Sequence, residues 1–97
     1  MSLPAPSRTS YALVTGASQG IGKAMAQDFA ALGYNVILVA RRRELLESIA
    51  AELEQRHNID AIALPADLAV ADDVARVTDT IATHEVSILV NSAGIAS

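Results

Sequence analysis

A short glycine-rich stretch, residues 15–22, has the residue types and spacing best suited to chemistry; it reads Thr-Gly-Ala-Ser-Gln-Gly-Ile-Gly. Glycines let a backbone approach an anion closely, and the N–H groups in the first turn of a helix are unpaired and carry partial positive charge. An apolar run, residues 11–14, precedes the stretch, and a helical pattern follows it. This order of strand, glycine turn and helix predicts a phosphate-binding turn, which we interpret as the pyrophosphate site of a dinucleotide-binding unit.

Two other phosphate-binding loops fail on spacing. A nucleoside-triphosphate loop needs G-x-x-x-x-G-K-[ST]. Gly22 and Lys23 match its end, but Ala17 stands where its first glycine belongs, and Ala24 offers no hydroxyl for Mg²⁺. The G-x-G-x-x-G fingerprint fails because the glycines stand at 16, 20 and 22. The pattern that fits is T-G-x-x-x-G-x-G, so a nucleoside-triphosphate switch is disfavoured.

Arginines follow the second apolar run, residues 35–40, where a dinucleotide site selects its cofactor. A site for NAD has an acidic residue there, which holds the ribose 2′-hydroxyl, whereas this chain has Arg41 and Arg42 and no acid before Glu44. A carboxylate would repel a 2′-phosphate, and a guanidinium binds one in a forked geometry. The sequence therefore predicts NADP(H), with Arg41 as the main contact, Arg42 as the second and Ser18 as a helper.

A solvated basic helix start is the alternative for these arginines. In that arrangement Arg43 pairs with Glu47 one helical turn later. The alternative stays open for Arg41 and Arg42, and it is the favoured interpretation of Arg43.

The elements that must position these residues alternate between short apolar strands and helices. Strands are expected at about 11–15, 35–40, 61–64 and 87–90, and helices at about 21–32, 43–55 and 71–83. On the first helix the apolar residues at helical spacing are Ile21, Ala24, Met25, Phe29 and Leu32. The alternation predicts an α/β fold, a partial Rossmann-like doubly wound parallel sheet of four strands in the order 3-2-1-4 with three helices. Residues 1–9 are expected to form a flexible N-terminal arm.

Composition narrows the remaining function classes. Of the 97 residues, 52% are hydrophobic and 19% are charged, which suits a buried core. The chain has no cysteine, so disulfides, thiolate catalysis and Cys-based zinc sites are excluded, and no metal site is expected. The net charge of -4 disfavours a nucleic-acid surface. The longest apolar run, residues 36–40, is far short of the roughly 20 residues of a membrane span, so we expect a cytoplasmic protein with no membrane contact.

Three motifs, each after an expected strand, resemble those of the classical branch of the short-chain dehydrogenase/reductase (SDR) family. They are residues 15–22, Asp67-Leu68 after the third strand, and Asn91-Ser92-Ala93-Gly94 after the fourth. The resemblance runs from about Tyr11 to Gly94, so residues 10–97 are expected to form the N-terminal part of a dinucleotide-binding (Rossmann) domain. One position departs from the family pattern: Ser92 stands where the family usually has a second Asn, and a hydroxyl cannot reproduce the paired contacts of an amide.

The resemblance implies a dinucleotide site built from these motifs. In it the glycines shape the pyrophosphate turn and Thr15 ties that turn to the sheet. The carboxylate of Asp67 accepts from the adenine amino group, and Asn91 lies along the ribose and phosphate. The cofactor-binding residues expected from the motifs and the arginines are Gly16, Ser18, Gln19, Gly20, Ile21, Gly22, Arg41, Arg42, Asp67, Leu68, Asn91, Ala93 and Gly94. The alternatives are a turn or cap role for Asp67 and, for Asn91, a strand-end residue bonded to its own backbone.

The implied activity is the interconversion of an alcohol and a carbonyl by hydride transfer on a small-molecule substrate. In the family this chemistry needs a Tyr, a Lys four residues later and an upstream Ser. This sequence has only Tyr11 and Tyr34, neither followed by a lysine at that spacing, and its one lysine is Lys23. No catalytic residue is therefore assigned in this chain, which resembles the first half of a family member and is expected to be inactive alone.

A truncated, non-catalytic module for nucleotide binding or assembly is the alternative function. A half sheet of four strands leaves the fourth strand as an unprotected edge strand, and a single helix covers one face of the sheet only in part. We therefore expect a homo-oligomer or a chain of marginal stability.

Overall fold

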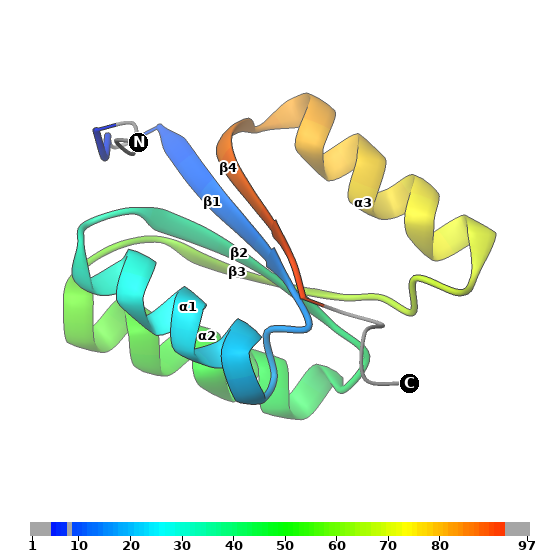
Figure 1. Ribbon diagram of the computed structural model, residues 1–97, viewed down its shortest axis with the longest axis horizontal. Helices are drawn as coiled ribbons and strands as arrows, with labels where there is room; N and C mark the ends of the chain where they lie inside the picture. The colour runs from blue at the N-terminus through cyan, green and yellow to red at the C-terminus, as the bar shows by residue number, and fades with distance from the viewer. Residues whose placement is uncertain (1–4, 8, 93–97) are drawn as a thin grey trace.

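The computed structural model describes residues 5–7 and 9–92, in which strands and helices alternate (Figure 1). The elements are β1 (Ser10–Thr15), α1 (Gly20–Ala31), β2 (Asn35–Ala40), α2 (Arg43–His57), β3 (Ala61–Pro65), α3 (Ala71–Thr83) and β4 (Glu85–Asn91). Every expected element is present, and β2 and α3 have their expected bounds. β3 extends one residue further than expected, to Pro65, because a strand at the end of a sheet tolerates proline.

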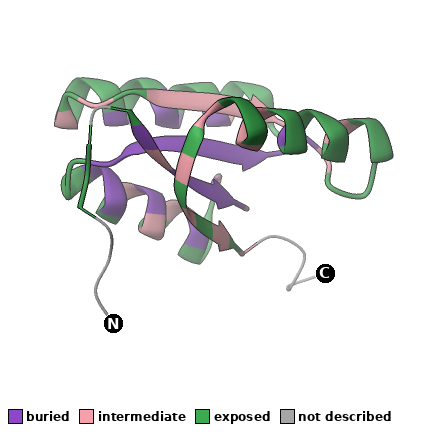
Figure 2. Ribbon diagram, turned by 90° about the horizontal axis from the view of Figure 1, so that it is seen from above, coloured by how far each residue is buried: buried purple, intermediate pink, exposed green. Residues whose placement is uncertain are grey.

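The strands form one parallel sheet in the order β3-β2-β1-β4, which confirms the predicted topology. Val14 of β1 lies beside Leu38 of β2 and beside Val90 of β4. Helices α1 and α2 cover one face of the sheet and α3 covers the other, as Figures 1 and 2 show. Because all strands run in the same direction, their carboxyl ends and the loops that follow lie together, at what we call the carboxyl edge of the sheet. The amino ends of the strands lie at the opposite side, the amino edge.

Strand β2 is the centre of the core, and all six of its residues are buried. Its side chains alternate between two apolar clusters. Val36, Leu38 and Ala40 belong to the larger cluster, which includes residues of α1 and α2, whereas Ile37 and Val39 belong to the smaller one with Val77 of α3. Helices cover both faces of this strand, so it is apolar at successive positions rather than at alternate ones.

The buried face of α1 differs from the expected apolar stripe. The buried residues are Gly22, Ala26, Phe29 and Ala30. Ile21 and Leu32, which the periodicity places on the stripe, are 74% and 59% exposed, and Ala24 is also exposed, so the prediction was wrong at these three positions. Gly22 lies close to Gly16 and Ser92, so the inner face at the start of the helix falls at Gly22 rather than at Ile21.

Helix α1 ends in a left-handed turn at Gly33, which has a φ of 100°. The N–H of Gly33 donates to the carbonyl of Ala30, and the N–H of Tyr34 donates to that of Phe29, both at 3.0 Å. This is the hydrogen-bond pattern of a glycine C-cap. The rings of Phe29 and Tyr34 pack edge to face with their centres 5.6 Å apart, which fixes where β2 begins.

Strand β4 lies at the end of the sheet and is only partly covered. Its residues alternate between exposed and half-buried. Consecutive residues of β1 pair with Val86 and Ile88, so Ser87 is an inserted residue, a β-bulge. Beyond the bulge, Ile88 and Val90 pack against the larger cluster, whereas Leu89 is 60% exposed. Leu13, the neighbour of Leu89 on β1, is fully buried, so the cover of this face of the sheet is less complete at β4 than at β1.

Candidate functional site

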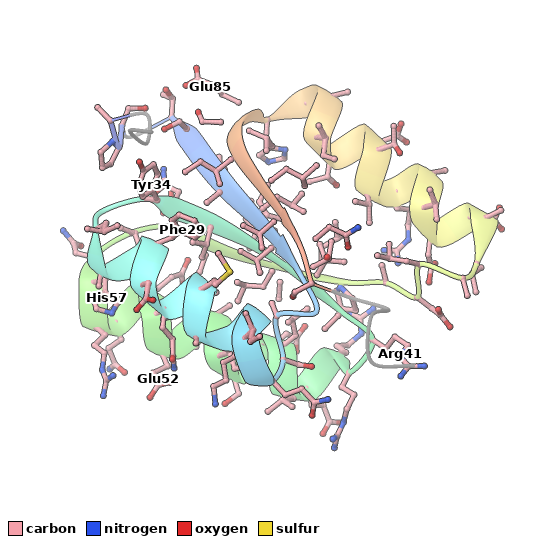
Figure 3. All side chains as sticks on the ribbon, in the orientation of Figure 1. Phe29, Tyr34, Arg41, Glu52, His57 and Glu85 are labelled. Carbon is pink, nitrogen blue, oxygen red and sulfur yellow. The ribbon has the colours of Figure 1, made fainter. Side chains whose placement is uncertain are left out.

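The carboxyl edge of the sheet brings together loops that are far apart in the sequence. The N–H of Ala17, in the loop after β1, donates to the carbonyl of Val39 at 3.1 Å. The N–H of Ala66, in the loop after β3, donates to the carbonyl of Ala40 at 2.8 Å. These two bonds hold the loops on either side of the end of β2, and Arg41 follows directly (Figure 3).

The glycine turn is shaped for the approach of an anion. Gly16 and Gly20 have φ values of 65° and 61°, a left-handed conformation that other residues rarely adopt. Gln19 stands at the N-cap of α1 in extended conformation, and its side chain makes no capping hydrogen bond. The first turn of α1 also carries no acidic residue. The N–H groups at the start of this helix are therefore left to bind a negatively charged group.

Gly22 is required by a close contact. A Cβ atom at this position would collide with the carbonyl of Gly16 and would lie 2.6 Å from Oγ of Ser92. The first turn of α1 thus packs directly on the glycine turn and on the residue after β4. Any side chain at position 22 would push these three segments apart.

Thr15, Asn91 and Ser92 join the ends of β1 and β4 by hydrogen bonds. The hydroxyl of Thr15 donates to Oδ1 of Asn91 at 2.8 Å and accepts from the N–H of Ser92 at 3.1 Å. The hydroxyl of Ser92 donates to the carbonyl of Thr15. Thr15 thus ties the turn to the sheet as expected. The side-chain oxygen of Asn91 accepts from this threonine, and among the described residues its amide N–H groups have no partner, so they can act as donors. The hydroxyl of Ser92 links β4 to β1, which gives this departure from the family pattern a structural role.

The three arginines after β2 differ in their partners. Arg43 lies 3.7 Å from Glu47, which confirms the helix-surface pairing expected for it. Arg41 and Arg42 are exposed, and neither has an ion-pair partner among the residues that the structure describes. Their charge is therefore available to an anion at this edge.

Asp67 and Leu68 lie in the loop between β3 and α3. Oδ1 of Asp67 accepts from the N–H of Ala69 at 2.9 Å, so the turn role left open for this residue is present. Its other carboxylate oxygen has no partner within residues 5–7 and 9–92 and remains available to a ligand. Leu68 is exposed beside it. The two remaining site residues from the sequence, Ala93 and Gly94, lie outside the described residues.

Two charged residues that the sequence analysis did not single out hold this loop. Oδ2 of Asp73 accepts from the N–H of Asp67 at 2.7 Å, and Oδ1 of Asp73 binds Arg76 at 3.2 Å. The hydrogen bond from Asp67 lowers the pKa of the Asp73 carboxyl, and Arg76 lowers it further against the opposing effect of burial. The i, i+3 spacing of an acid and an arginine was the signal in the sequence.

The opposite edge of the sheet holds a separate hollow of about 590 Å³, lined by Pro6, Ser7, Gly33, Asn35, Asn58, Ile59 and Asp60. Both tyrosines also lie toward the amino ends of the strands. Tyr34 is buried, and burial raises the pKa of the Tyr11 hydroxyl, with a further rise from the charge of Asp60. Among the described residues there is no group of three His, Cys, Asp or Glu side chains placed to hold a metal. Nor, in the same part of the chain, is any helix both long and apolar enough to cross a bilayer.

Comparisons with known proteins give the family. The short chain dehydrogenase family model matches residues 10–97. Very-long-chain 3-oxoacyl-CoA reductase-A of Danio rerio is 33% identical over 94 residues, which cover 97% of this chain and 30% of that protein. 17-beta-hydroxysteroid dehydrogenase type 3 of Homo sapiens is 38% identical over 85 residues, covering 88% of this chain and 27% of that protein.

Solved structures agree with the family and with the fold. A short-chain dehydrogenase from Sphingobium yanoikuyae in complex with NADPH superposes with a TM-score of 0.85 at 38% identity, over 88% of this chain and 34% of that one. L-sorbose reductase from Gluconobacter frateurii, complexed with NADPH and L-sorbose, has a TM-score of 0.80 at 34% identity, over 87% of this chain and 33% of that one. The chain thus spans about a third or less of the length of these proteins. The protein belongs to the short-chain dehydrogenase family of oxidoreductases.

Proposed function

We propose that this chain is the NADP(H)-binding portion of an oxidoreductase that interconverts an alcohol and a carbonyl on a small-molecule substrate. The observation that carries the proposal is the position of Arg41, exposed and without an ion-pair partner among the described residues, directly after β2. The loop after β1 is bonded to the end of the same strand. A pyrophosphate on the glycine turn and a 2′-phosphate on the arginine fit this pair of neighbouring sites. Two structural neighbours that were solved in complex with NADPH support the choice of cofactor.

Each segment of the edge has its own proposed role. The turn residues Gly16, Ser18, Gln19, Gly20, Ile21 and Gly22 surround the pyrophosphate, and Arg41 with Arg42 binds the 2′-phosphate. The free carboxylate oxygen of Asp67 accepts from the adenine amino group, while Leu68 packs against the base. Asn91 offers its amide N–H groups to ribose or phosphate oxygens, and Ala93 and Gly94 continue that contact.

The chemical step needs groups that this chain does not supply. The bound nicotinamide supplies hydride transfer, and family members pass the accompanying proton through a Tyr assisted by a Lys. Lys23 lies in the first turn of α1, whereas Tyr34 is buried just before β2, at the opposite edge of the sheet. The raised pKa of Tyr11 is opposite to that of a phenol prepared to give up a proton. We therefore propose that the 97-residue chain binds cofactor without turnover.

Arg41→Ala tests the cofactor assignment. Loss of a charge-assisted contact costs about 1.5–3 kcal/mol, so we expect affinity for NADPH to fall roughly 10- to 150-fold, with little change for NADH. Calorimetric titration of both cofactors measures the two changes. Arg43→Ala is the matched control, since that residue is also exposed and is paired with Glu47. Equal weakening of NADPH and NADH by Arg41→Ala would refute the 2′-phosphate contact.

Assembly through β4 is a second candidate function. Strand β4 is at the end of the sheet within the described residues, and an edge strand presents unpaired backbone groups to another chain. Leu89 is 60% exposed on it. We expect light scattering to show self-association of the 97-residue chain that Leu89→Lys reduces. Leu32→Lys, at a residue that is 59% exposed on the end of α1, is the control. A monomer at all concentrations would count against this function.

A further inference from the structure

The loop between β3 and α3 is held by a pair of charged side chains from α3. Asp73 uses both carboxylate oxygens: Oδ2 accepts from the N–H of Asp67 at 2.7 Å, and Oδ1 accepts from Arg76 at 3.2 Å. Arg76 also donates to the carbonyl of Pro65, the last residue of β3. The two side chains therefore bind the backbone of the loop at Pro65 and at Asp67, the residues on either side of Ala66.

The same loop is fixed from within and from the sheet. The N–H of Ala66 donates to the carbonyl of Ala40 at 2.8 Å, which ties the loop to the end of β2. The N–H of Val70 donates to the carbonyl of Asp67, and the N–H of Ala69 donates to Oδ1 of Asp67, both at 2.9 Å. The carboxylate of Asp67 is thus aimed by its own turn, and the turn is oriented by Asp73 and Arg76.

The contacts of Asp73 with the Asp67 N–H and with Arg76 favour the ionised form of its carboxyl. The hydrogen bond from Asp67 lowers the pKa of the Asp73 carboxyl, and the neighbouring guanidinium of Arg76 lowers it further. The guanidinium of Arg76 lies 3.2 Å from the carboxylate of Asp73, so its positive charge balances that negative charge beside the loop. The side chains of Arg76 and Asp73 are 49% and 27% exposed, so solvent reaches the pair but does not surround it.

We propose that Asp73 and Arg76 are positioning residues that orient the carboxylate of Asp67 and thereby set how strongly the chain binds the adenine amino group of NADP(H). The inference rests on the proposed function in one respect, the contact of Asp67 with that amino group. Neither Asp73 nor Arg76 touches the cofactor in this assignment. Their effect on binding passes through the loop, from α3 to Asp67.

A purely structural role, starting α3, is the competing explanation, and it predicts different behaviour. Val70 is the N-cap of α3 and provides no side-chain hydrogen bond, so Asp73 could serve only to stabilise the helix. If this were its only role, substituting Asp73 would lower the stability of the folded chain without any preference for one cofactor over another. A positioning role changes affinity for ligands that carry the amino group and leaves the others unchanged.

The experiment compares Asp73→Ala with Asp72→Ala. Asp72 lies in the same first turn, is exposed, and its side chain makes no hydrogen bond or ion pair among the described residues, so the control removes the same charge without releasing the loop. The first measurement is amide hydrogen exchange of the Asp67 N–H in the free chain. We expect exchange to speed up in Asp73→Ala and to stay unchanged in Asp72→Ala. Unchanged protection of the Asp67 amide in Asp73→Ala would show that Asp73 does not hold the loop, whether or not any cofactor binds.

The second measurement is calorimetric titration with NADPH and with its hypoxanthine analogue, in which an oxygen replaces the amino group. Asp73→Ala and Arg76→Met should each weaken NADPH binding by about three- to tenfold, because a misoriented Asp67 loses only part of a hydrogen bond to a charged group. Binding of the analogue should not change. Asp73→Asn, which keeps an acceptor oxygen, should be intermediate. In an Asp67→Ala background, Asp73→Ala should have no further effect on affinity.

The outcomes separate the two proposals. If Asp73→Ala weakened the binding of NADPH and of its hypoxanthine analogue equally, the positioning role would be overturned while the proposed function stands. An equal effect of Asp72→Ala on NADPH binding would have the same consequence. No binding of NADPH by the unsubstituted chain would overturn the proposed function and the cofactor half of this inference. Faster exchange of the Asp67 amide in Asp73→Ala would still establish that Asp73 holds the backbone of the loop. Thermal unfolding of each variant checks that the altered chains remain folded.

Discussion

The two edges of the sheet use polar residues in opposite ways. At the amino edge, Asn35 is buried, with 5% of its surface exposed. Its Nδ2 donates to the carbonyl of Ser10 at 3.2 Å, and its Oδ1 accepts from the N–H of Asp60 at 3.0 Å. This one amide joins β1, β2 and the residue before β3. At the carboxyl edge, Arg41 is exposed and without an ion-pair partner among the described residues, although it also directly flanks β2 (Figure 3).

The difference separates stability from binding. A buried polar group with its bonds made stabilises the fold, and breaking those bonds costs the desolvation of the groups left behind. An exposed, unpaired charge contributes little to folding and is free to bind an anion. We therefore expect substitutions at the amino edge to lower the free energy of unfolding and those at the carboxyl edge to lower cofactor affinity. Gly22 is the exception, because it has both roles.

Gly22→Ala should have the largest effect and should lower both quantities. The new Cβ would meet the backbone of Gly16 and the hydroxyl of Ser92, and backbone cannot move aside cheaply. We expect a loss of about 3 kcal/mol in the free energy of unfolding, which outweighs the roughly 1 kcal/mol that alanine gains in a helix. NADPH binding should be lost with it. Urea denaturation and calorimetric titration measure the two effects.

Gly20→Ala is the matched control for that change. Gly20 lies in the same turn with a φ of 61°, but a Cβ there would have nothing within 4 Å. Its cost should be only the strain of a left-handed alanine, about 1–2 kcal/mol. If the two variants were equally stable, the contact at Gly22 would not be the reason for its glycine.

Asn35→Ala should have a smaller effect, on stability alone. Removing the amide leaves the Asp60 N–H and the Ser10 carbonyl without this partner, so we expect the free energy of unfolding to fall by about 1–3 kcal/mol. NADPH affinity of the folded chain should not change, because Asn35 opens β2 at the edge opposite Arg41. Gln55→Ala, at an exposed amide on α2, is the control and should change neither quantity. Weaker NADPH binding by Asn35→Ala at unchanged stability would contradict the division between the two edges.

Local sequence patterns were enough to predict most of the fold. Apolar runs such as residues 35–40 form a strand wherever both faces are covered, and the spacing of the helical residues is set by the helix itself. The expected stripe on α1 was wrong at Ile21, because the glycine at 22 sets the inner face and a periodicity of large apolar residues does not include glycine. The predicted cofactor roles stay predictions.

The sequence by itself determined the alternation of strands and helices, the glycine turn at residues 15–22 and the arginines after β2, because each depends on neighbours along the chain. Only the tertiary structure decided that Ser92 would bond to Thr15, 77 residues away, and that Asp73 would hold the backbone of Asp67. It also decided that Arg41 has no ion-pair partner among the described residues. The physical reason is that such contacts depend on strand register and on the packing of loops against strand ends, which residue type and spacing do not encode.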